Sequence, residues 1–157
     1  GTPPVVGGSL SNVTLPAYSI TIISTNGNGS TATNNLVSNP SFEAEQYNTQ
    51  TPNGWAEAQY NSSWQAVTAD ASYSESYGGS ASGNYHGTHW KNSAYRVYTW
   101  QTKTGLSNGL YTLRCKAKSG GGQIQCYLEA KDFGGSARIA HLPVSSTYQL
   151  VEIKDIN

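Results

Sequence analysis

The chain has 157 residues, enough for one ordinary domain with a buried core and a short appendage. Nine basic and nine acidic residues cancel, and only 11% of residues are charged, which excludes the basic patch that nucleic acids or anionic membranes require. Small polar residues, Gly and Tyr dominate instead, as in many extracellular bacterial β-domains.

Methionine is absent, even at position 1, which predicts a mature or excised piece of a longer protein whose signal peptide has been removed. The longest apolar runs are only a few residues long, so we expect no segment that spans a membrane. These features together predict a secreted, extracellular bacterial protein with neither nucleic-acid nor membrane partners.

Residues 1–24 are predicted to lie outside the main domain. The run 13–23 is typical of one strand interrupted by Pro16, and a single strand cannot bury an apolar face alone. Its phrase LPAYSITII resembles the last strand of the β-sandwich that closes many clan-A type glycoside hydrolases. The segment is either the tail of such an upstream domain or an extra edge strand of the domain that follows. Residues 25–34 contain only small polar residues, Gly and one Ala, and are expected to form a linker.

Residues 35–157 are predicted to form one all-β domain, most simply a β-sandwich of two antiparallel sheets. Turn signals recur along this range, for example Pro52-Asn53-Gly54 and Gly120 to Gly122, and no apolar period of 3.6 persists beyond two turns. Trp55 and Trp64 lie in short alternating runs near its start.

Two strands have clear faces. Within 110–118, Tyr111, Leu113 and Cys115 alternate with polar residues, and within 123–131 the apolar face is expected to hold Ile124, Cys126, Leu128 and Ala130. If 119–122 turns a hairpin between them, Cys115 and Cys126 lie directly opposite each other. The two cysteines are then expected either to form a disulfide or to remain as two buried thiols.

The segment 80–100 carries three tyrosines, two tryptophans and two histidines without Pro or carboxylates. It is predicted to form two neighbouring strands with an exposed aromatic face. Alternation assigns Tyr85 and His89 to the core and His86 and Trp90 to the exposed face. A zinc site at His86 and His89 is not expected, because residues three apart on a strand point to opposite faces.

Several phrases carry a resemblance: NLVSNPSFE, SGNYHGTHW, QTKTGLSNGLYTLRCKAKSGGG and YQLVEIKDIN. Together they resemble the calcium-containing jelly-roll carbohydrate-binding modules of bacterial polysaccharide hydrolases, and most of all modules attached to galactan- and arabinogalactan-degrading enzymes. The resemblance covers residues 35–157 and implies a non-catalytic module that holds an upstream catalytic domain of the same polypeptide near a polysaccharide. It also implies further strands beyond Asn157. The jelly roll is therefore expected either to lack its C-terminal strands or to receive them from elsewhere, for example from residues 13–23 by strand addition.

Sugar faces pack on aromatic rings, and planar polar side chains read the hydroxyl groups beside them. The candidate sugar-binding residues are His86, Trp90, Arg96, Tyr98, Trp100, Arg114, Gln125, Tyr127 and, as a loop-borne platform, Trp64. The alternative is that Trp90 and Trp100 are core residues and that the polar ones are merely solvated. Trp55, in the Gly-Trp phrase of the resembled modules, is assigned to the core.

The resemblance implies a structural Ca²⁺ held by Glu43, Glu75 and a carbonyl around Gly79, with one further ligand beyond Asn157. Oxygen ligands of this kind suit calcium, although the two carboxylates are alternatively solvated surface charges. The nine carboxylates show no paired signature, and no GxSxG motif occurs, so no catalytic residues are predicted. The rival hypothesis to sugar binding is an adhesion or structural β-sandwich of a cell-surface protein, whose aromatic sheet binds protein.

Overall fold

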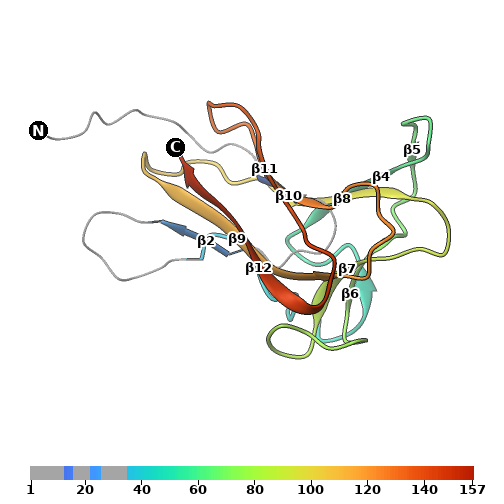
Figure 1. The fold of residues 1–157 in the computed structure, drawn as a ribbon. Coiled ribbons are helices and arrows are strands. Elements are labelled where there is room, and N and C mark those ends of the chain that lie inside the picture. The colour runs from blue at the N-terminus through green and yellow to red at the C-terminus, as the bar shows by residue number, and fades with distance from the viewer. Residues whose placement is uncertain (1–12, 16–21, 26–34) are drawn as a thin grey trace, which may run out of the picture.

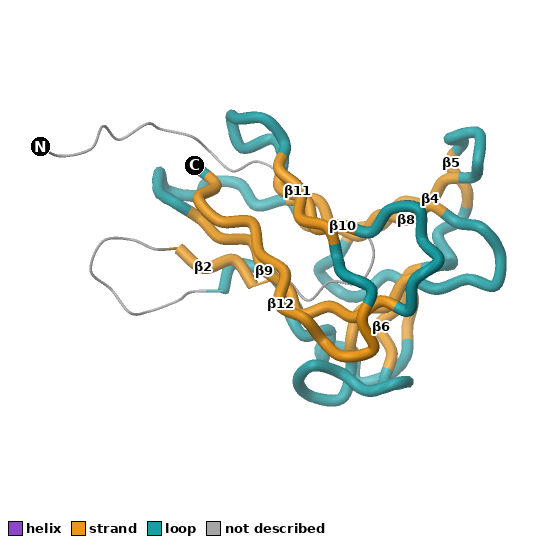
Figure 2. The backbone as a smooth tube through the Cα atoms, in the orientation of Figure 1, coloured by secondary structure: helices purple, strands orange, loops and turns teal. Residues whose placement is uncertain are grey.

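The structure is a computed structural model of the chain and describes residues 13–15, 22–25 and 35–157. All regular structure in these ranges is β-strand, as Figure 2 shows, and this confirms the predicted all-β class. The described part contains no helix long and apolar enough to cross a membrane. The jelly-roll topology stays a prediction.

Twelve strands of the described residues form four antiparallel sheets. The first sheet has the strand order β1 (Val13–Leu15), β8 (Arg96–Gln101), β4 (Ala56–Tyr60) and β5 (Ala66–Val67), and the second has the order β12 (Ser145–Ile156), β9 (Tyr111–Ser119) and β2 (Ile22–Thr25). The third sheet has the order β3 (Thr49–Gln50), β6 (Ser72–Glu75) and β7 (His86–His89). The fourth sheet pairs β10 (Tyr127–Ala130) with β11 (Arg138–His141). In Figure 1 the long β9 and β12 pair occupies one layer, and β11, β10, β8 and β4 follow one another along the other.

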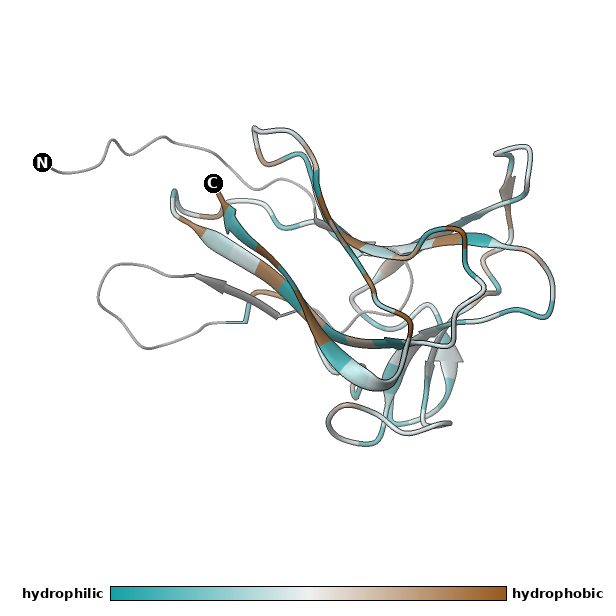
Figure 3. Cartoon of the chain, in the orientation of Figure 1, coloured by the Kyte–Doolittle hydropathy of each residue, from teal (hydrophilic) through white to brown (hydrophobic). Residues whose placement is uncertain are grey.

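The core lies between these layers. The predicted inward face of β9 is confirmed, because Leu113 is 0% exposed and Cys115 is 2% exposed while the residues between them are more accessible. Val151 and Ile153 of β12 pair with these two positions and are also buried. Figure 3 shows the corresponding alternation of apolar and polar segments along β12. Period-2 alternation thus places one face of this pair against the core.

The predicted hairpin at residues 119–122 is wrong. Strand β9 pairs with β12 and β2, whereas β10 begins at Tyr127 and pairs with β11. The loop after β9 carries the chain to the other layer and leaves Ile124 fully exposed, not in the core. Strand β12 has 12 residues and pairs along most of β9, and its Val151 and Ile153 are buried with Cys115 and Leu113, whereas β10 has only four residues.

Cys115 and Cys126 are buried thiols and do not form a disulfide. Both join the same core cluster, but they do not face each other in a strand ladder. Burial raises the pKa of Cys115 to about 12 and that of Cys126 to about 11. Both thiols therefore stay protonated at neutral pH and behave as small apolar groups.

The N-terminal segment contributes two short strands, not the single strand predicted for 13–23. Val13–Leu15 pairs with β8, and Ile22–Thr25 pairs with the edge of β9 that β12 leaves open. Residues 16–21 between them lie outside the described residues, as do residues 1–12 and most of the predicted linker 25–34. Both described pieces are hydrogen-bonded into the sheets of the main domain, which agrees with strand addition.

The assignment of β7 faces from alternation is only half right. His89 is 3% exposed, as predicted, but His86 is also buried, at 6%, instead of lying on an open face. The reason is that the three-stranded sheet containing β7 is covered on both sides. Phe42 and a polar cluster at His89 cover the face that carries Gly87 and His89, and the other face carries His86 beside Glu75 and the buried Thr88.

That polar cluster links β6, β7 and β8. His89 Nε2 lies 2.7 Å from Thr99 Oγ1, which lies 2.9 Å from Ser72 Oγ. All three side chains are buried. Desolvation lowers the pKa of His89 to about 3, and it also lowers the pKa of His86. The folded protein therefore holds the His89 imidazole neutral at mildly acid pH.

We expect the buried His89 to make the stability of the fold sensitive to acid. Below the ordinary histidine pKa of about 6.5 the unfolded chain binds protons that the folded chain does not, so stability is complete above that pH and falls toward pH 3. One such proton changes the free energy of unfolding by up to about 1.4 kcal/mol per pH unit. In urea unfolding between about pH 4 and pH 7, His89→Gln should show a shallower slope than the native chain. His141→Gln, at an exposed histidine, serves as the control and should leave the slope unchanged. Equal slopes for all three proteins would contradict this role for His89.

Candidate binding groove

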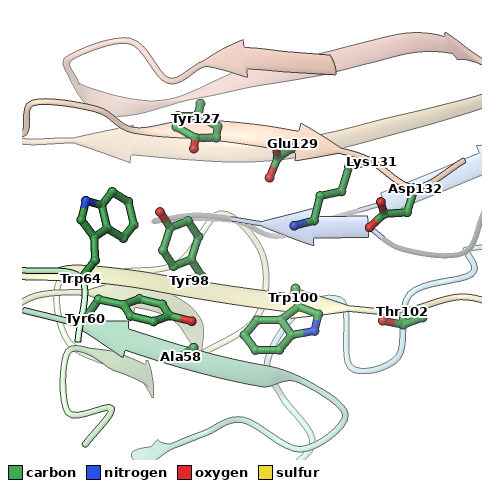
Figure 4. A pocket seen from close by; sticks show the side chains of 10 residues that line it. All are labelled: Ala58, Tyr60, Trp64, Tyr98, Trp100, Thr102, Tyr127, Glu129, Lys131 and Asp132. Atoms are coloured by element: carbon green, nitrogen blue, oxygen red, sulfur yellow. The ribbon is translucent and has the colours of Figure 1, made fainter. Parts of the chain in front are cut away.

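An open groove of about 670 Å³ runs along the outer face of the layer that contains β8. Figure 4 shows its two walls, one from β4 and β8 and the other from β10 and the residues that follow it. Strand β1 pairs with β8 and lies against β10, so it bridges the two walls. The lining residues are Ala58, Tyr60, Trp64, Tyr98, Trp100, Thr102, Tyr127, Glu129, Lys131 and Asp132.

Strand alternation explains how β8 presents its rings. Val97, Thr99 and Gln101 are buried on the inner face, so Tyr98 and Trp100 project from the outer face. The neighbouring strand β4 places small residues beside them, because Ala58 pairs with Tyr98 and Ala56 pairs with Trp100. Large rings on one strand beside alanines on the next leave room above the sheet for a ligand.

The loop between β4 and β5 holds Trp64 above one end of the groove. Asn61 organises this loop: its Oδ1 accepts hydrogen bonds from Ser63 N (2.9 Å) and Gln65 N (3.0 Å), and its carbonyl accepts one from Trp64 N (3.1 Å). Trp64 has φ 60° and a side chain 60% exposed. A bulky residue with positive φ is energetically unfavourable, and such residues concentrate at functional sites.

Arg96 packs against the face of the Trp64 ring and is not one of the residues that line the groove. The guanidinium carbon lies 3.5 Å from the ring centroid, and Nη1 donates to the carbonyl of Asn61 at 3.2 Å. On the groove side, Tyr60 lies 6.1 Å from Trp64 and 5.9 Å from Tyr98, measured between ring centroids. The cation–π contact and the hydrogen bond both hold the guanidinium of Arg96 against the Trp64 loop, so the Trp64 ring is supported before any ligand binds.

Polar groups face these rings across the groove. Burial raises the pKa of Tyr98, Tyr127 and Glu129, and the charge of Glu129 adds to the shift of both tyrosines. The two phenols therefore stay protonated at neutral pH and both donate and accept hydrogen bonds. Lys131 partly offsets the pKa shift of Glu129, whereas Asp132 increases it. The groove thus combines apolar ring faces with hydrogen-bond donors and acceptors and with side chains of both charge signs.

The predicted sugar-binding residues fall into separate places. Trp64, Tyr98, Trp100 and Tyr127 line the groove together, and Arg96 lies behind Trp64. The other four lie elsewhere: His86 is buried on β7, Trp90 is 59% exposed directly after β7, Arg114 is on β9 of the opposite layer, and Gln125 is in the exposed loop before β10. These four residues do not line the groove. For Arg114 the reason is that β9 and β10 belong to different layers, so the two strands do not share one polar face as predicted.

Sequence reasoning missed several lining residues, chiefly Tyr60 and Glu129. Glu129 follows Tyr127 by two residues and so shares its face, which was a usable signal. Tyr60 shares a face with Ala56 and Ala58, and this short alternation was visible too. Lys131, Asp132 and Thr102 follow strand ends, where alternation no longer predicts direction, and no local signal identified them.

The predicted calcium ligands have other partners. Glu43 Oε1 accepts hydrogen bonds from the backbone N–H groups of Asn84 and Tyr85, both at 2.7 Å. Glu75 Oε1 lies 3.9 Å from His86 Nε2. No group of three His, Cys, Asp or Glu side chains suited to a metal occurs within the described residues.

The carbonyl of Gly79 also has protein partners. It accepts a hydrogen bond from Tyr148 Oη at 2.9 Å and lies 3.5 Å from Lys118 Nζ, which also donates to Gly78 O at 2.7 Å. Calcium bound through Glu43, Glu75 and the carbonyl of Gly79 stays a prediction, and no property of the groove depends on it.

The chain matches no protein family model, no curated protein and no solved structure. The groove itself therefore carries the functional argument.

Proposed function

We propose that this chain is a non-catalytic carbohydrate-binding module that targets an attached glycoside hydrolase to plant polysaccharide outside a bacterial cell. The observation that supports the proposal most is the open groove, in which the rings of Tyr60, Trp64, Tyr98, Trp100 and Tyr127 share one surface. Sugar rings offer C–H faces that pack on such side chains and hydroxyl groups that need donors and acceptors beside them. Galactan and arabinogalactan are the favoured ligands, because of the phrases quoted above.

The placement of carboxylates supports a binding role more than a hydrolytic one. A glycosidase flanks the scissile bond with two carboxylates, one on each side of the substrate. Here Glu129 and Asp132 both come from the same wall, β10 and the residues directly after it. The opposite wall presents rings and Ala58 and no carboxylate among the lining residues. A sugar in this groove has an acid on one side only.

Affinity electrophoresis against a panel of soluble polysaccharides tests the proposal. We expect β-galactan, arabinogalactan, xylan or β-glucan to retard migration of the native chain, with a galactan the most effective. Retardation by none of these would count against sugar binding and would favour the alternative of an adhesion domain that binds protein, since aromatic surfaces also serve protein interfaces.

Arg96 provides a test of how the groove is organised. Arg96→Ala removes the support of the Trp64 ring without touching a lining residue, so we expect affinity for the retained polysaccharide to fall about fivefold, the equivalent of about 1 kcal/mol. Arg96→Lys keeps the charge but not the planar contact or its hydrogen bond, and it should recover only part of the loss. Isothermal calorimetry measures both. Full affinity in Arg96→Ala would show that Trp64 needs no support.

A further inference from the structure

Within the part of the chain that the structure describes, the groove is open at both ends. At one end Trp64 is 60% exposed. At the other end Thr102 and Asp132 are exposed, while Tyr98, Trp100, Tyr127 and Glu129 between the ends are partly buried. A site that captures the end of a polymer needs a wall that stops the chain. Here the most enclosed part is the middle, and the most accessible parts are the two ends.

The groove is also longer than one sugar. Trp64 lies against Arg96, Tyr98 and Trp100 follow along β8, and Thr102 lies just past the end of that strand. Six residue steps at ~3.3 Å each span ~20 Å. The length therefore accommodates several consecutive sugar rings, with Trp64, Tyr98 and Trp100 as successive contacts.

Charge in the groove is mixed, not cationic. Glu129 and Asp132 accompany Lys131, and the guanidinium of Arg96 lies against Trp64 and donates to a backbone carbonyl. Recognition of a polyuronate requires Arg or Lys groups that pair with carboxylates. Two carboxylates in the same wall repel such a chain, whereas neutral hydroxyl groups find both donors and acceptors.

From the open ends, the length and the mixed charge we infer that the groove binds an internal stretch of a neutral polysaccharide, several sugar units long, and not a chain end. This inference rests on the proposed function and makes it more specific. The wall formed by β4 and β8 and the wall that holds Glu129 contact the sugar chain from opposite sides.

Calorimetry with an oligosaccharide ladder prepared from the retained polysaccharide tests the binding mode. Affinity should rise about tenfold or more from disaccharide to pentasaccharide, because each further ring stacked gains on the order of 1 kcal/mol. Reduction of the reducing end with borohydride should leave the affinity of the pentasaccharide unchanged. Binding of the monosaccharide or disaccharide with the full affinity of the polymer, or loss of binding on reduction, would overturn internal binding while leaving sugar binding intact. Binding of no saccharide at all would overturn the proposed function as well.

Two further arms separate the parts of the inference. Polygalacturonate, tested at low salt, should not retard the chain, and its retention would overturn the preference for neutral polymers. Trp64→Gly, at one end, should lower affinity for the pentasaccharide more than for the disaccharide, since the shorter ligand has room to bind without reaching Trp64. An equal loss for both lengths would mean that every ligand uses the Trp64 end, as expected for capture of a chain end.

Discussion

Replacing Trp64 with glycine should lower affinity for the retained polysaccharide about tenfold to thirtyfold while leaving the domain folded. Tryptophans that anchor an interface typically contribute about 2 kcal/mol, which corresponds to this range. The ring is 60% exposed at the end of the groove, and its only described ring contacts are to Arg96 and Tyr60. Its removal therefore leaves the core untouched.

The backbone at Trp64 offers an unusually clean control. Its φ of 60° suits glycine, whereas a residue with a Cβ is disfavoured there by about 1 kcal/mol or more. Trp64→Gly and Trp64→Ala lose the same ring, so we expect equal affinities but a higher thermal midpoint for the glycine variant. Trp90→Ala, at a ring of similar exposure outside the groove, should bind normally. If the affinities of these variants correlated with their thermal midpoints, or if Trp90→Ala lost a similar share of affinity, the groove would not be the binding site.

Replacing Phe42 with alanine should lower the free energy of unfolding by about 3–5 kcal/mol, a large part of the stability of an ordinary domain. Phe42 is 2% exposed and stacks on Trp55, with ring centroids 5.0 Å apart and planes at 17°. It also joins loop 35–48 to β6, because Ser74 Oγ donates to its carbonyl at 3.0 Å. Urea unfolding measures the loss, and Tyr77→Ala, at a ring 83% exposed, should show almost none.

Gly87 gives an independent measure of the same contact. A Cβ at Gly87 would lie 2.6 Å from Phe42 Cζ, so Gly87→Ala should cost about 1–3 kcal/mol by overpacking. In Gly87→Ala with Phe42→Leu the smaller side chain relieves the clash, and the double variant should be more stable than the sum of the single effects predicts. Additive losses would show that the two residues do not compete for space.

Local patterns predicted local features of this chain well. The faces of β8 and β9 and the turn at Pro52-Asn53-Gly54, in which Trp55 N donates to Pro52 O at 3.0 Å, follow from residues within a few positions of one another. Each depends on alternation along one strand or on turn chemistry, which neighbouring residues determine. Burial of His86 was missed because alternation shows which residues share a face, not whether that face is covered. His86 lies beside Glu75 and the buried Thr88, on the face opposite Gly87 and His89.

The sequence by itself determined the all-β class and the outward direction of Tyr98 and Trp100 on β8, since the class and the alternation are properties of composition and of single strands. Only the tertiary structure decided that Tyr60, Trp64 and Tyr127 join them, while Arg114 points from the opposite layer. The reason is that strand pairing is chosen by burial across the whole chain. Strand β9 pairs with β12 and not with β10. This pairing determines on which side of the molecule the polar face of each strand lies.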